Sequence, residues 1–168
     1  GFLSWILARP NLYRVSWFFG GLGLFLNIYG FALRVYIMGR PPVSNMYETV
    51  VWVGFGAVLF AMIIEYFYRW RFVLAAGMLV GAGCLALADA APAVLDGSLQ
   101  PLEPVLRSNF WLLVHVMTIT ISYAAFFLAF ALGDLGLFYF LKEQTPKDEK
   151  VKAIVLAIYR AIQIGVAF

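Results

Sequence analysis

The sequence predicts an all-α, polytopic transmembrane helical bundle with four full spans and the start of a fifth. Of its 168 residues, 64% are hydrophobic and only 12% are charged, about half the charged fraction of a typical soluble domain. The mean hydropathy is +0.89. The apolar residues also lie in continuous runs long enough to cross about 30 Å of hydrocarbon as helices. We treat residues 1–168 as a single transmembrane domain.

Three apolar runs have the length of one membrane span each, at residues 15–38, 46–67 and 72–91. The fourth run, residues 109–141, exceeds the length of one span, so we expect it to tilt or to project beyond the bilayer. The fifth apolar run begins near Ile158. Residues 151–162 alternate charged and apolar side chains at helical spacing, which predicts an interfacial amphipathic helix leading into that span.

Polar connectors separate the runs, and their charges predict an orientation. Residues 39–45 contain Gly39, Pro41 and Pro42, which interrupt a helix. Most cations fall at one end of the alternating spans, which predicts that this end is cytoplasmic and that loops 39–45 and 92–108 face outward. The cytoplasmic group is Arg9, Arg14, Arg69, Arg71, Lys142, Lys147, Lys150 and Lys152, and the outward group is Arg34, Arg40 and Arg107.

Composition also excludes some functions. The net charge of +3 is spread over the ends of apolar runs and forms no basic patch, so we expect no nucleic-acid partner. The single cysteine, Cys84, permits neither an internal disulfide nor a cysteine-based metal site. The partner that composition implies is the lipid bilayer.

The chain has one histidine, His115, about six residues into the fourth apolar run and roughly 9 Å along a helix axis. It lies just inside the predicted outer interface. A neutral imidazole there could donate a nitrogen to iron. The alternative is an interfacial histidine that donates a hydrogen bond to a neighbouring helix.

Other polar residues have several possible roles. Asn45, Tyr47 and Glu48 gather at the outward start of the second run, where Glu48 either stabilises the helix N-terminus or contributes to a site. Glu65 and Arg69 stand at i and i+4, which predicts a local ion pair. Asp134 lies about 28 Å of helix beyond His115, too far to share its site, and we expect it to pair with a basic residue near the cytoplasmic face.

Two stretches together resemble a known family. Residues 39–48, Gly-Arg-Pro-Pro-Val-Ser-Asn-Met-Tyr-Glu, resemble the outward loop and helix start of cytochrome c assembly proteins of the CcsA/ResC type. Residues 99–102, Leu-Gln-Pro-Leu, followed by residues 106–116 and by Ser-Tyr-Ala at 122–124, resemble the segment leading to the family's first external histidine. Residues 159–165 also fit the start of the family's next span.

This resemblance implies heme handling in System II cytochrome c maturation. Heme b would be presented at the outer face and attached to Cys-x-x-Cys-His apocytochromes, together with a partner biogenesis membrane subunit. His115 matches the first of two external histidine ligands, and Arg107 is a candidate to neutralise a heme propionate. Trp111, Asn45, Tyr47 and Glu48 complete the candidate cofactor-binding set, and the implied location is the bacterial inner membrane or, alternatively, the thylakoid membrane.

The chain also departs from the family pattern. It has no Trp-Gly-x-x-Trp-x-Trp-Asp signature, no second external histidine and no membrane histidines. We therefore expect it to be either the N-terminal portion of a longer protein, truncated before the Trp-rich external segment, or a degenerate relative of the family. One histidine cannot supply both axial ligands, so this chain alone should not catalyse attachment. The alternative function is a structural subunit that scaffolds a larger membrane complex, and a small transporter is a weaker third option.

Overall fold

The computed structural model describes residues 10–39, 41–92, 95, 97–98, 110–142 and 148–168. It contains five helices in this described part of the chain, and four are long and apolar enough to cross a membrane. The predicted fold class is thus confirmed: the chain is a multi-pass membrane protein. The helices are α2 (Pro10–Met38), α3 (Met46–Tyr68), α4 (Phe72–Ala90), α6 (Phe110–Lys142) and α7 (Asp148–Ala167).

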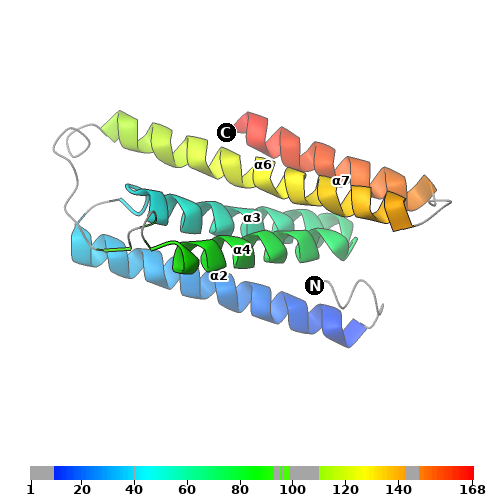
Figure 1. The fold of residues 1–168 in the computed structure, drawn as a ribbon, viewed down its shortest axis with the longest axis horizontal. Helices are drawn as coiled ribbons and strands as arrows, with labels where there is room; N and C mark the ends of the chain where they lie inside the picture. Colours follow the sequence, from blue (N-terminus) through cyan, green and yellow to red (C-terminus); the bar gives the residue numbers. More distant parts are fainter. Residues whose placement is uncertain (1–9, 40, 93–94, 96, 99–109, 143–147) are drawn as a thin grey trace.

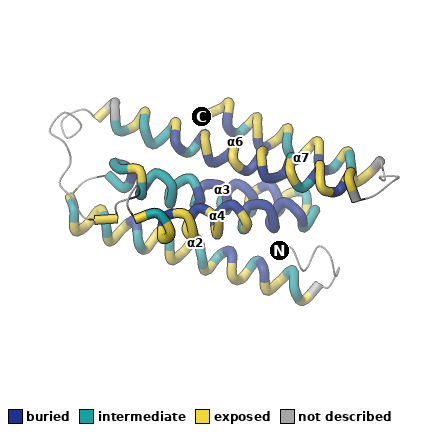
Figure 2. The backbone as a smooth tube through the Cα atoms, in the orientation of Figure 1, coloured by how far each residue is buried: buried dark blue, intermediate teal, exposed yellow. Residues whose placement is uncertain are grey.

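The bundle has α3 and α4 at its centre, α6 and α7 together on one side and α2 on the other (Figure 1). Figure 2 shows the same division in burial, because the dark, buried positions concentrate in the central pair while α2 is largely exposed. In a membrane protein, an exposed apolar surface of this kind faces lipid or another membrane segment.

Small residues allow α3 and α4 to approach closely, as is typical of membrane helices. A Cβ atom built at Gly77 would lie 2.2 Å from the Cβ of Ala61, and one at Gly54 would lie 2.8 Å from the Cβ of Cys84. No side chain fits between the two backbones at these points. The central contact therefore depends on glycine and alanine rather than on large interlocking side chains.

The turn between α3 and α4 is closed by a buried carboxylate. Arg69 ends α3 in the left-handed conformation, with φ 53°, and its N–H donates to the Glu65 carbonyl. The Glu65 side chain is fully buried and accepts hydrogen bonds from the backbone N–H groups of Arg71 and Leu74. Glu65 thereby satisfies N–H groups at the start of α4, which has no cap from its own N-cap side chain.

The Tyr13 hydroxyl of α2 donates to the same carboxylate, at 2.9 Å from Oε1. The predicted ion pair between Glu65 and Arg69 is wrong, since Arg69 contributes its backbone to the cap and its side chain is exposed. The physical reason is that buried N–H groups at a helix start compete for the carboxylate more effectively than a solvated guanidinium does.

The fifth segment is helical, as expected. Residues 151–162 belong to α7, an amphipathic helix that runs without a break to Ala167, packs along α6 and buries Ile154, Ala157 and Ala161. Among the described helices, α7 is not one of the four that are long and apolar enough to cross a membrane. The Ser122 hydroxyl of α6 donates to the Gly165 carbonyl of α7 at 2.7 Å. The joined ends of α6 and α7 extend past the α3–α4 turn in Figure 1, which fits the expected projection of the long fourth run.

Candidate functional site

The end of α2 and the start of α3 are joined by an ion pair with a buried carboxylate. Arg34 Nε lies 3.3 Å from Glu48 Oε1, and the Glu48 side chain is only 2% exposed. The other carboxylate oxygen, Oε2, accepts from the backbone N–H and the hydroxyl of Ser44, at 3.0 and 2.7 Å. Glu48 thus joins the end of α2 to the start of α3 and to Ser44, just before that helix.

Local sequence explains why Glu48 lies where it does. Asn45 is the N-cap of α3, and its side chain accepts from the Glu48 N–H at 2.7 Å. An N-cap amide followed by an acidic residue three positions later is a typical helix start, and a carboxylate in the first turn is favourable there. The helix-start role expected for Glu48 is confirmed. Its involvement in cofactor binding remains a prediction.

Arg34 connects the start of α3 to the loop that follows α4. Its Nη2 donates to the Gly97 carbonyl at 3.1 Å, and its guanidinium carbon lies 5.1 Å from the centre of the Tyr47 ring. A cavity of about 450 Å³ adjoins these groups. The contacts to Gly97 and Glu48 bring the ends of both loops together, as expected for loops on one side of the membrane.

Arg34 was not among the candidate site residues from the sequence. A signal was nonetheless present, because an arginine inside an apolar run needs a partner, and Glu48 is the acidic residue at the start of the next run. The sequence does not show that the two side chains meet, since their contact depends on how the helices α2 and α3 pack.

His115 lies in the second turn of α6, and its side chain is exposed. It forms no hydrogen bond with another described residue, so the alternative of a hydrogen bond to a neighbouring helix gains no support from the described part of the chain. Arg107 lies outside the described residues. Trp111 is within α6, but its side chain is not among those described.

His115 and Glu48 lie at the same end of the bundle. Gly56 of α3 faces Ala124 and Ile121 of α6 with no room for a side chain, and the two helices run in the same direction (Figure 1). His115 does not line the cavity beside Arg34, Tyr47 and Glu48. The structure therefore gives two separate features at this end of the bundle, an accessible imidazole and a buried ion pair.

The remaining acidic residues add no further metal site. Asp134 is exposed beside a groove between α4 and α6 and has no ion pair with a described residue. No group of three or more His, Cys, Asp or Glu side chains suited to a metal occurs in the described ranges. Within these ranges, iron ligation by a histidine could come only from His115.

The Arg34–Glu48 pair should stabilise the fold by coupling its two helices. We expect Arg34→Met to lower the free energy of unfolding by about 2 kcal/mol, because the buried Glu48 carboxylate would lose a charged hydrogen-bond donor that α2 supplies. The measurement is SDS-induced unfolding in mixed micelles. Glu48→Gln and the double variant complete the cycle, and strictly additive effects would show that the two residues are not coupled.

A family profile and individual known proteins both show similarity to this chain. The profile of the family described as "Cytochrome C assembly protein" matches residues 43–168. Protein NrfI of Wolinella succinogenes is 34% identical over 142 residues, covering 82% of this chain and 15% of that protein. The cytochrome c biogenesis protein CcsA of Synechococcus sp. strain CC9902 is 36% identical over 118 residues, covering 70% of this chain and 38% of that protein.

A third relative, the cytochrome c biogenesis protein CcsA of Microcystis aeruginosa, is 38% identical over 90 residues, which is 52% of this chain and 26% of that protein. The chain thus spans well under half the length of these relatives. The family profile includes residues on both sides of His115, since it begins at Val43 and extends to Phe168.

Proposed function

Because this chain belongs to the cytochrome C assembly protein family, we propose that it is the heme-handling membrane part of a cytochrome c maturation protein. The family supports a role in cytochrome c maturation. We further propose that it binds and presents heme, and that the residues named below perform this step. The observation that carries this proposal is His115, the chain's one histidine, exposed near the start of α6 within the matched segment.

The donor chemistry at His115 fits one side of a heme iron. An imidazole that has no described hydrogen-bond partner keeps its nitrogen lone pair available to a metal. Its position in the second turn of α6 leaves it near the interface, where heme propionates would reach water. Bound heme would supply the iron and the vinyl groups, while this chain would hold the iron on one face.

The chain can supply only one histidine to the axial ligand set. Since it has one histidine, a second ligand would come from elsewhere in the full-length protein or from a partner biogenesis subunit. Heme b is the form that we expect to be held, and a Cys-x-x-Cys-His apocytochrome is the expected acceptor. Attachment would then need the other parts of the assembly.

The remaining candidate residues would act around the propionates and the loops. Arg107 is proposed to neutralise a propionate and Trp111 to pack against the macrocycle, since aromatic and guanidinium groups are suited to these contacts. For Asn45, Tyr47 and Glu48 the hydrogen bonds support an indirect role, in which they hold the outward loop beside the site.

We expect His115→Gly to lower heme retained by the purified full-length protein about tenfold, which corresponds to about 1.4 kcal/mol of lost binding free energy. The effect is limited because the second ligand and the macrocycle contacts remain. The measurement is the heme absorbance per protein, with the Soret position as a second readout. Added imidazole should restore the wild-type spectrum by replacing the missing ligand.

Thr118→Ala is the matched control. Its hydroxyl bonds to the Val114 carbonyl of its own helix at 2.8 Å, so its loss removes a polar group one turn away from His115 without touching a ligand. Unchanged heme content and spectra in His115→Gly would remove His115 from the ligand set. A full-length protein without heme would favour the scaffold function instead.

A further inference from the structure

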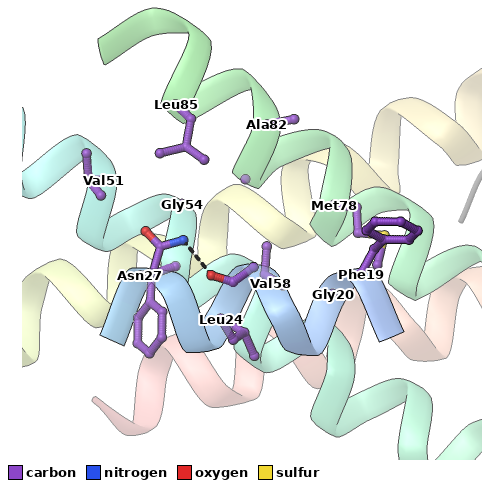
Figure 3. Close-up of a pocket in the computed structure, with 13 residues that line it drawn as sticks. Phe19, Gly20, Leu24, Asn27, Val51, Gly54, Val58, Met78, Ala82 and Leu85 are labelled. Carbon is purple, nitrogen blue, oxygen red and sulfur yellow. Dashed lines mark hydrogen bonds between the residues drawn. The ribbon is translucent and has the colours of Figure 1, made fainter. Parts of the chain in front are cut away.

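A continuous groove separates the middle of α2 from α3 and α4. Two adjoining cavities, of about 240 and 450 Å³, share Asn27, Val51 and Leu85 in their linings. We call their union the α2 groove. Its inner part, shown in Figure 3, lies between Phe19, Gly23 and Leu24 of α2 and the facing residues of α3 and α4.

Helix α2 is attached to the bundle on either side of this groove. Towards the inner end, the Tyr13 hydroxyl bonds to Glu65, and Gly20 approaches Met78 so closely that a Cβ would lie 2.7 Å from its Cε. At the outer end, Arg34 pairs with Glu48. Between these attachments a Cβ at Gly23 or at Gly30 would meet nothing within 4 Å. The groove is therefore bounded at both ends and open between them.

The groove is polar at one end only. At its middle, Asn27 directs its amide nitrogen to the Gly23 carbonyl of its own helix, at 2.9 Å (Figure 3). At the outer end, Arg34 uses Nε and Nη2 in the bonds to Glu48 and Gly97, and its Nη1 has no hydrogen-bond partner among the described residues. An occupant would thus have a hydrocarbon body and a hydrogen-bond acceptor at one end.

The lining of the groove on α2 runs from Phe19 to Arg34, about 22 Å at a rise of 1.5 Å per residue. Its open stretch, from Gly23 to Arg34, covers about 16 Å, and half of a hydrocarbon core of about 30 Å is about 15 Å. The open stretch therefore corresponds to one leaflet. Left empty, such a groove would forfeit dispersion contacts along its walls, and its apolar lining offers water few partners.

We propose that the α2 groove binds one acyl chain of a phospholipid from the leaflet at the Arg34 end, with a phosphate oxygen accepting from Arg34. The acyl chain lies along Gly23 and Gly30 and fills the space that a side chain would occupy at these two positions. The lipid thereby completes the contact between α2 and the central pair. This site is independent of His115 and of the proposed heme step.

The test uses a photoactivatable phosphatidylglycerol, with a diazirine in the acyl chain, in nanodiscs holding the full-length protein. Cross-links should map to groove-lining residues of α3 and α4, such as Val51, Val58 and Leu85. We expect Gly23→Leu and Gly30→Leu each to reduce this labelling about tenfold, because leucine displaces several methylene groups. A diacylglycerol probe, which lacks the phosphate, should label less than phosphatidylglycerol.

Gly21→Leu is the matched control, since a Cβ there also meets nothing within 4 Å but Gly21 does not line the groove. All three variants gain the same helix propensity, and circular dichroism verifies that each is folded. Equal labelling of the control and the two groove variants would overturn the proposal. The proposal would also be overturned if a second protein segment occupied the groove. The same holds if added heme displaced the probe from both the wild type and His115→Gly.

Discussion

Gly77→Leu should lower the free energy of unfolding by about 3 kcal/mol, towards the upper end of the range for overpacked sites. A Cβ at this position would lie 2.2 Å from the Ala61 Cβ and 3.1 Å from the Ala57 carbonyl oxygen. The second neighbour is backbone, so it cannot move aside without displacing α3. The larger side chain would thus separate the two central helices, on which the rest of the bundle packs.

The measurement is unfolding by SDS in mixed micelles, followed by circular dichroism. Gly83→Leu is the matched control, because a Cβ at Gly83 on the same helix meets nothing within 4 Å. Both substitutions bring the same gain in helix propensity. If Gly83→Leu is as destabilising as Gly77→Leu, the close contact between α3 and α4 is not what limits residue size at position 77.

Glu65→Ala should have a similar effect, about 3 kcal/mol, for a different reason. The carboxylate satisfies the N–H groups of Arg71 and Leu74, and removing it leaves two donors at a buried helix start without an acceptor. Each unsatisfied buried donor costs about 1–3 kcal/mol. The α2 helix also loses its inner attachment, the Tyr13 bond.

Tyr13→Phe separates the two contributions. It removes only the hydroxyl bond to Glu65, so we expect a loss of about 1 kcal/mol in the same SDS titration. Glu65→Gln, which keeps one acceptor oxygen, should fall between these two variants. Equal destabilisation by Glu65→Ala and Tyr13→Phe would mean that the carboxylate matters to α2 alone and not to the start of α4.

The outcome for individual residues shows how far sequence patterns reach. The helix start at Asn45 and Glu48 could be predicted because capping depends on residues three or four positions apart. The same local argument failed for Glu65 and Arg69, where spacing suggested an ion pair and the folded turn instead presents N–H groups to the carboxylate. The spacing of residues shows which side chains can come into contact along one helix. It does not show which of several available hydrogen-bond partners a side chain binds.

The candidate site divides in the same way. His115 could be singled out because it is the chain's one histidine in an apolar run, and its place in the second turn of α6 agrees with the expected position along the helix. Its role as a ligand remains a proposal. The Arg34–Glu48 pair and the α2 groove could not be foreseen, because both arise between helices whose relative placement no local pattern records.

The sequence by itself determined the class of protein, the number of long apolar spans and the family, since hydrophobic run length and local motifs are properties of contiguous residues. The tertiary structure alone decided which small residues form the α3–α4 contact, which acceptor caps α4 and where α2 stands apart from the bundle. The physical reason is that these features depend on distances between segments far apart in the chain, and those distances are set by close packing of backbones rather than by any single helix.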